Sequence, residues 1–198
     1  MSLTQVLQAK GFHEFEGFSQ QIPQQITDLQ RIVGTSPIRI MEIGFNAGHS
    51  AEIFLQHNPH ATVTSFDLGM HPYVTHAKEY MDQHYPGRHT LILGDSKETI
   101  PTYIQTHYND PLVPFDVIFI DGDHEYHGAR TDMNHCFHLA HRDTIVILDD
   151  TMYFSDWRAS WTLGPTKVWT DDLAARRLIE IGRSDYAPGR GMSWGKYV

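Results

Sequence analysis

The chain has 198 residues, of which 40% are hydrophobic and 20% charged, and its formal net charge is −9. This length and composition indicate one globular domain. The acidic charge argues against a nucleic-acid partner, because binding to a phosphate backbone depends on clustered Lys and Arg. The single cysteine, Cys136, excludes an intrachain disulfide bond.

The N-terminal residues contain no apolar stretch of the kind found in a signal peptide. No run of about 18 apolar residues occurs anywhere in the chain, so we expect no membrane partner. These features predict a cytoplasmic protein. They do not set the oligomeric state, and a homo-oligomer is left open.

Two N-terminal helices are predicted, and short apolar runs then alternate with helical patterns. The helices are expected at Leu3–Ala9, Ile22–Val33, His49–His57, Tyr73–Tyr85, Lys97–Tyr108 and Tyr126–Ala140. The apolar runs lack polar alternation, which indicates strands buried on both faces. They lie at Ile38–Ile43, Thr62–Phe66, His89–Leu93, Asp116–Ile120 and Thr144–Leu148.

Alternating strands and helices are typical of an α/β fold with a Rossmann-like, doubly wound sheet. The rhythm changes near the C-terminus. Residues 164–182 indicate a loop that leads into a helix, and residues 184–198 indicate two short strands joined by a Pro/Gly turn. We therefore expect a mostly parallel, seven-stranded sheet that ends in an antiparallel hairpin.

Carboxylates follow the predicted strands at the positions where open parallel sheets bind ligands. These ends read Glu42-Ile43-Gly44, Asp67-Leu68-Gly69, Gly94-Asp95-Ser96, Asp121-Gly122-Asp123 and Asp149-Asp150-Thr151. Because the carboxyl ends of parallel strands lie at one edge of a sheet, we expect the functional site there.

The first two strand ends suit a nucleoside that carries an amino acid. Gly44 and Gly48 allow close backbone approach, and the helix that follows offers free N–H groups to a carboxylate. Glu42 suits an ammonium group, and an acid at the position of Asp67 is placed to accept hydrogen bonds from ribose hydroxyls. A turn with these two glycines alone is a weak signal, and a purely structural tight turn is an even alternative.

The segments EIGFNAGHS, SFDLG, LGDS and FDVIFIDGDHEY resemble, in this order and spacing, the successive motifs of class I S-adenosylmethionine-dependent methyltransferases. IDGDHEY followed by VILDD is similar to their metal-dependent O-methyltransferase branch, which includes catechol-type enzymes and sugar enzymes of antibiotic pathways. The resemblance covers about residues 36–151. It implies one methyltransferase domain over residues 1–198, with an N-terminal helical segment (1–35), a cofactor-binding core (36–151) and an acceptor-side segment with the hairpin (152–198).

The resemblance also assigns cofactor contacts. It places Glu42, Gly44, Asn46 and Gly48 at the methionine part of S-adenosylmethionine. It places Asp67 at the ribose, and Asp95 with Ser96 at the adenine end.

A divalent cation, most simply Mg²⁺, is expected at the later strand ends. Asp121, Asp149 and Asp150 follow strands that should be neighbours, and crowded carboxylates repel one another unless a cation offsets them. Such a cation would make an acceptor hydroxyl nucleophilic. A polar strand exit or a helix cap is the alternative for each acid alone.

His124 is the expected catalytic base, because resembling sugar enzymes use a histidine three positions after the first metal acid, here Asp121. A histidine that only bonds a helix start or the cofactor is the alternative. Asp123 is expected to cap the helix that follows, although a fourth metal ligand is also conceivable.

The predicted function is methylation of a small hydroxylated acceptor, sugar-like or phenolic, assisted by a divalent metal. Tyr153, Phe154, Trp157 and Trp161 follow the metal acids and would wall the acceptor pocket or form a lid, or else pack in the core or a dimer contact. The rival functions are metal-independent N-methylation on the same fold, a nucleoside-binding module without catalysis and, least favoured, a metal-dependent hydrolase.

Overall fold

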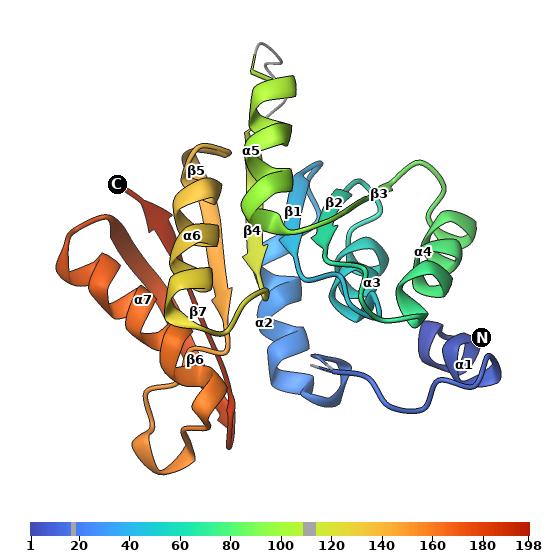
Figure 1. The fold of residues 1–198 in the computed structure, drawn as a ribbon, viewed down its shortest axis with the longest axis horizontal. Helices are drawn as coiled ribbons and strands as arrows, with labels where there is room; N and C mark the ends of the chain where they lie inside the picture. Colours follow the sequence, from blue (N-terminus) through green and yellow to red (C-terminus); the bar gives the residue numbers. More distant parts are fainter. Residues whose placement is uncertain (17–18, 109–113) are drawn as a thin grey trace. The chain divides into compact units, whose positions relative to one another are not determined.

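The computed structural model describes residues 1–16, 19–108 and 114–198. It divides into two compact units, Met1–Asp95 and Ser96–Val198. In Figure 1 the first unit contains α1 to α4 with β1 to β3, and the second contains α5 to α7 with β4 to β7. The division falls within the cofactor-binding core predicted for residues 36–151.

The first unit alternates helices and parallel strands. Its elements are α1 (Leu3–Ala9), a 3₁₀ turn (Ser19–Gln21), α2 (Pro23–Val33), β1 (Arg39–Ile43), α3 (His49–His57), β2 (Thr62–Asp67), α4 (Tyr73–His84) and β3 (His89–Leu93). The central strand β2 pairs in parallel with both β1 and β3. Helix α3 packs on β2, and α4 packs on β3.

The second unit begins in the same way and ends in a hairpin. Its elements are α5 (Ser96–Thr106), β4 (Phe115–Ile120), α6 (Tyr126–Phe137), β5 (Ala140–Asp149), two 3₁₀ turns (Ser155–Trp157, Ser160–Thr162), α7 (Leu163–Ala174), β6 (Leu178–Ala187) and β7 (Arg190–Tyr197). Strands β4 and β5 are parallel neighbours, whereas β7 runs antiparallel to both β5 and β6.

The strand order of the sheet is β3-β2-β1 in the first unit and β4-β5-β7-β6 in the second. This confirms the predicted α/β class with a seven-stranded, mostly parallel sheet and a C-terminal antiparallel hairpin. The last four residues of β1 and of β4 are buried, as predicted. The prediction is wrong for β3, where only His89 is buried, because β3 pairs with β2 alone at the edge of the sheet. Cys136 is a buried free thiol. Among the residues that the structure describes, no helix is long and apolar enough to cross a membrane.

Two predicted helix ends are wrong. The helix predicted to reach Ala140 ends at Phe137, because Ala140 already pairs with Phe115 as the start of β5. Helix α7 ends at Ala174, and residues 178–182 belong to β6 rather than to a helix. Pairing with β7, for example Leu178 opposite Tyr197, overrides the local helical pattern.

The first turn of α7 lies against the loop between β4 and α6. A Cβ atom at Gly164 would lie 2.2 Å from the carbonyl oxygen of His124 and 2.7 Å from the backbone nitrogen of Tyr126. Only a residue without a side chain fits there. The close approach therefore helps to fix the backbone that carries His124.

Gly164→Ala is expected to lower the free energy of unfolding by about 1–3 kcal/mol, because the added methyl group must push two backbone segments apart. Urea unfolding measures the difference. Leu163→Ala is the matched control: its side chain is 53% exposed, and a change within about 0.5 kcal/mol is expected. Equal stabilities of the two variants would contradict this packing.

Candidate functional site

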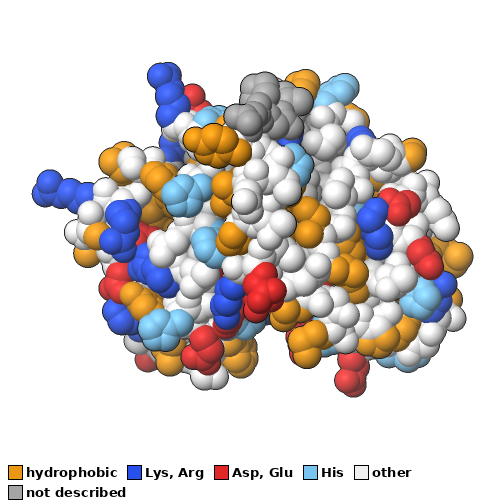
Figure 2. All heavy atoms as spheres, turned by 45° about the horizontal axis from the view of Figure 1, so that its top comes forward, with side chains coloured by type: hydrophobic (Ala, Val, Ile, Leu, Met, Phe, Trp, Pro, Cys, Tyr) orange, Lys and Arg blue, Asp and Glu red, His pale blue; other side chains and the backbone are white. Residues whose placement is uncertain are grey.

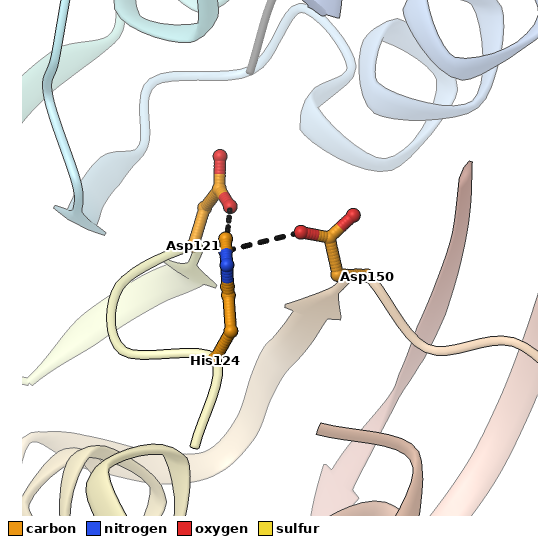
Figure 3. Close-up of side chains that lie close together, drawn as sticks. All are labelled: Asp121, His124 and Asp150. Atoms are coloured by element: carbon orange, nitrogen blue, oxygen red, sulfur yellow. Dashed lines mark ion pairs between the residues drawn. The ribbon is translucent and has the colours of Figure 1, made fainter. Parts of the chain in front are cut away.

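In the second unit, Asp121, His124 and Asp150 come together at the ends of β4 and β5. One possible ligand atom from each lies within 4.8 Å of the others. Figure 3 shows the imidazole of His124 directed toward both carboxylates. Its Nε2 lies 3.1 Å from Asp150 Oδ2 and 3.8 Å from Asp121 Oδ1.

Charge and burial set the protonation of this cluster. The contacts with Asp121 and Asp150 raise the pKa of His124 to about 10, although burial opposes the rise. Burial raises the pKa of Asp150, and its bond with His124 offsets part of that rise. In the absence of a cation, a proton on His124 therefore supplies the positive charge that two neighbouring carboxylates require.

The local backbone brings Asp150 to this position. Its φ angle is +55°, a conformation that is uncommon for any residue other than glycine and that Asp tolerates better than most. Asp149, one residue earlier, is the last residue of β5 and pairs with Met192 of β7. Among the described residues, Asp149 lies outside the group of ligand atoms around Asp121.

Asp123 organises the loop that leads into α6. Its Oδ1 accepts a hydrogen bond from the backbone N–H of Glu125 (2.9 Å), and its Oδ2 lies 3.2 Å from the ammonium group of Lys97. The residue at the N-cap of α6 is Glu125, so the prediction that Asp123 itself caps the helix is wrong by two positions. Its side chain instead bonds the backbone of the loop two residues ahead.

In the first unit, Asp67 joins the two loops that were expected to bind a cofactor. Its carboxylate accepts hydrogen bonds from the backbone N–H groups of Asn46 and Gly69, each 2.7 Å long. Asn46 has a φ of +50°, and Gly48 begins α3 with a φ of +80°. A Cβ atom at Gly48 would lie 2.9 Å from the ring of Phe45, which explains the glycine. The turn is thus preformed, with the N-terminus of α3 behind it.

Glu42 lies beneath this turn and is fully buried. Its two carboxylate oxygens accept hydrogen bonds from the hydroxyls of Ser50 and Ser65, the latter 2.5 Å long. The side chain therefore ties β1 to α3 and β2. Its predicted contact with an ammonium group stays a prediction.

The two remaining predicted contacts follow β3. Asp95 is exposed at the end of the first unit. Ser96 begins α5 in the second unit, where its hydroxyl donates a 2.7 Å hydrogen bond to Asp132 of α6. The hydroxyl of Ser96 is thus already engaged within the helical layer.

Sequence reasoning missed three exposed apolar side chains beside Asp67. Leu68, Met70 and Leu93 are 60%, 77% and 56% exposed. A Cβ at Gly69 would lie 3.2 Å from the Leu93 side chain, so the loop after β2 contacts the last residue of β3. The sequence did contain a signal, because an apolar residue such as Leu68 directly after Asp67 is unexpected in a solvated loop. Such side chains suit a flat, weakly polar ring.

Comparisons with known proteins agree with this arrangement. Residues 41–151, more than half of the chain, match the family described as a methyltransferase domain. No curated protein matches the sequence. Among solved structures, an O-methyltransferase from Bacillus cereus in complex with S-adenosylhomocysteine is similar over 99% of this chain and 90% of its own, with 19% identity and a TM-score of 0.73.

Two further structures share the fold. An O-methyltransferase of tomaymycin synthesis from Streptomyces achromogenes, bound to S-adenosylmethionine, has 13% identity and a TM-score of 0.72, with 99% of this chain and 87% of that chain covered. A TDP-rhamnose 3′-O-methyltransferase of calicheamicin biosynthesis has 20% identity and a TM-score of 0.64, with 87% and 77% covered. The matched segment covers more than half of the chain, and the fold agrees with it: the chain belongs to the methyltransferase domain family.

Proposed function

We propose that the protein is an O-methyltransferase that transfers the methyl group of S-adenosylmethionine to a small hydroxylated acceptor with the help of a divalent cation. The observation that carries this proposal is the cluster of Asp121, His124 and Asp150 in a chain of the methyltransferase family. Transfer from a sulfonium needs no acid, since the leaving group is already good. The protein must instead activate and align the acceptor hydroxyl.

The cluster fits a hard divalent cation. Asp121 and Asp150 offer carboxylate oxygens, the ligand type that Mg²⁺ prefers, and few protein ligands leave room for water and acceptor. When bound, the cation would lower the pKa of a coordinated hydroxyl and fix its position. Asp149, predicted from the sequence, is also a proposed ligand, and a separate variant tests its contribution to metal affinity.

His124 is the proposed proton acceptor. Its imidazole lies between the two carboxylates and is 44% exposed, so it can reach an acceptor hydroxyl held beside them. A positive charge at the carboxylates disfavours the imidazolium form and so lowers the pKa of His124 from its value in the cation-free protein. A neutral imidazole can then take the hydroxyl proton.

The loops of the first unit are the proposed donor site. No side chain caps the N-terminus of α3, and backbone N–H groups at such a helix end suit the carboxylate of the methionine part. Asp67 keeps lone pairs for ribose hydroxyls although it accepts two backbone bonds. Leu68 and Leu93 offer apolar surface to the adenine ring.

The acceptor is proposed to lie against the segment that follows Asp150. Phe154 and Trp157 are 51% and 38% exposed and meet edge to face, with ring centroids 4.8 Å apart. Asp185 of β6 accepts hydrogen bonds from the backbone N–H groups of Tyr153 and Phe154, which holds the segment on the hairpin. This favours a fixed aromatic wall over a mobile lid. Such a wall suits a sugar or phenolic ring, and one structural neighbour acts on TDP-rhamnose.

Calorimetric titration with Mg²⁺ and with S-adenosylhomocysteine tests both halves of the proposal. Asp121→Asn and Asp150→Asn should each weaken Mg²⁺ binding at least about 10-fold, because each removes a charged ligand, and should leave cofactor affinity unchanged. Asp67→Ala should weaken S-adenosylhomocysteine binding and leave Mg²⁺ affinity unchanged. The Mg²⁺ affinity of Asp149→Asn shows how much Asp149 contributes to metal binding.

Asp123→Asn is the control, because Asp123 bonds Glu125 and Lys97 outside the cluster. It should bind both ligands as the wild type does. Cofactor binding without any Mg²⁺ binding would leave the family intact and would favour metal-independent methylation.

His124→Ala should lower turnover by about 10²- to 10⁴-fold, the usual contribution of a general base. Release of S-adenosylhomocysteine in the presence of a panel of sugar and phenolic acceptors measures turnover. Cofactor and Mg²⁺ affinities should stay near those of the wild type. Wild-type turnover would remove His124 as the base, and a large loss of Mg²⁺ affinity would make it a ligand instead.

The cation-free protein should lose stability as the pH rises from about 6.5 to about 10, the interval between the ordinary pKa of His124 and its raised pKa. A group whose pKa is raised by folding stabilises the protein fully below its unfolded pKa, and this contribution disappears above the folded pKa. Urea unfolding with chelator present, on wild type and His124→Ala, measures it. The difference between the two proteins should shrink across this interval; a constant difference would contradict the ion pairs.

A further inference from the structure

Arg190 lies beside the proposed acceptor site of the second unit. It is the first residue of β7, which runs antiparallel to β5 with Met192 opposite Asp149. The start of β7 therefore lies at the same edge of the sheet as the end of β5, where Asp150 follows. Burial raises the pKa of Asp150, and the bond with His124 and the charge of Arg190 both lower it. The charge of Arg190 thus reaches the acidic cluster.

Two glycines fix the backbone on either side of Arg190. A Cβ atom at Gly191 would lie 2.1 Å from the carbonyl oxygen of Thr151, so only a residue without a side chain fits there. On the other side, the backbone N–H of Gly189 donates a 2.8 Å hydrogen bond to the carbonyl oxygen of Trp157. Arg190 is therefore held against the segment that follows Asp150 and carries the aromatic wall.

The guanidinium group of Arg190 forms no ion pair or hydrogen bond with any residue that the structure describes, although the side chain is half-buried. Most other Lys and Arg side chains of the second unit are paired, and Figure 2 shows such side chains beside Asp and Glu on one face. The pairs are Lys97–Asp123, Arg130–Asp172, Arg142–Asp143, Lys167–Asp171, Arg177–Asp172, Arg183–Glu180 and Lys196–Asp143. A half-buried guanidinium has five N–H donors and normally finds partners for them.

A second arginine lies on the neighbouring segment. Arg158 directly follows Trp157, whose carbonyl oxygen is bonded to Gly189 just before Arg190, so the two arginines lie on adjacent backbone segments. The Nε of Arg158 donates a 2.9 Å hydrogen bond to the carbonyl oxygen of Met152, and its terminal nitrogens have no partner among the described residues. Neighbouring positive charges repel each other unless an anion offsets them. Guanidinium donors match the paired oxygens of a carboxylate or a phosphate.

We propose that Arg190, with Arg158 beside it, binds an anionic group of the acceptor, either a carboxylate or a phosphate. This rests on the proposed function and narrows the acceptor class to hydroxylated molecules that carry a negative charge. The ring of such an acceptor lies on the aromatic wall, its hydroxyl at Asp121 and Asp150, and its anionic group at the two arginines. Neither arginine takes part in the methyl transfer, and both select and orient the acceptor.

The test uses two pairs of compounds in which one member has an added anionic group: catechol with 3,4-dihydroxybenzoate, and glucose with glucose 6-phosphate. Calorimetric titration of the whole protein, saturated with S-adenosylhomocysteine and Mg²⁺, measures each affinity. In at least one pair the wild type should bind the anionic member about 10- to 100-fold more tightly, the usual effect of hydrogen bonds to a charged group. A preference in the phenolic pair assigns a carboxylate, and one in the sugar pair assigns a phosphate.

Arg190→Gln should remove most of this preference and leave the affinity for the neutral member unchanged. Arg158→Gln should reduce the preference less, because the Nε of Arg158 is already bonded to the backbone. Arg176→Gln is the matched control. Arg176 also forms no ion pair within the described part of the chain, but it precedes β6, whose first residue pairs with Tyr197 at the far end of β7. This variant should keep the wild-type preference.

A residue that only offset the charge of Asp150 would affect both members of a pair equally and would change Mg²⁺ affinity. Such equal effects, an unchanged preference in Arg190→Gln, or a wild type that favours neither anionic compound or binds neither would overturn the inference and leave the proposed function standing. Failure of the wild type to bind S-adenosylhomocysteine would overturn the proposed function first, and this inference with it.

Discussion

Two carboxylates at the ends of neighbouring parallel strands repel each other. The second unit must therefore place a positive charge between them. Asp121 follows β4 and Asp150 follows β5, and His124 lies between them. Several local features keep His124 there. Asp123 bonds the loop backbone, and the first turn of α7 approaches the same loop so closely that only Gly164 fits. Apolar side chains at these positions would stabilise the fold as much as the charged ones or more. The presence of the charged groups therefore indicates a functional role.

The first unit carries the proposed donor site, whose ligand would combine a flat adenine ring with a ribose and a charged amino-acid end. Asp67 fixes the turn after β1 and the loop after β2 with one side chain. Near it lie the N-terminus of α3, which has no side-chain cap, and the exposed leucines Leu68 and Leu93. In the proposed site, the polar groups suit the ribose and amino-acid parts of such a nucleoside, and the apolar side chains suit its base. The proposal therefore assigns one reactant to each unit, so each assignment can be tested by a separate binding measurement.

Local patterns were enough to predict most of the fold. Helix α3 and strand β3 have the predicted bounds, because each is set by its own periodicity and by turn residues beside it. The start of β6 was mispredicted because residues 178–182 become a strand only through pairing with β7, which a local helical pattern does not reveal. The site follows the same rule. Asp121 and Asp150 were predicted from strand ends and His124 from the family resemblance, whereas the φ of +55° that places Asp150 could not be predicted from the sequence.

The central claim is that the charge between Asp121 and Asp150 is supplied by a catalytic cation. A crystal structure of the protein with Mn²⁺ and S-adenosylhomocysteine, with anomalous scattering used to locate the metal, tests it most directly. The account predicts a metal peak about 2.0–2.3 Å from carboxylate oxygens of both Asp121 and Asp150, together with S-adenosylhomocysteine at the loops around Asp67. S-adenosylhomocysteine bound there with no metal at these carboxylates, or with the metal elsewhere, would contradict it.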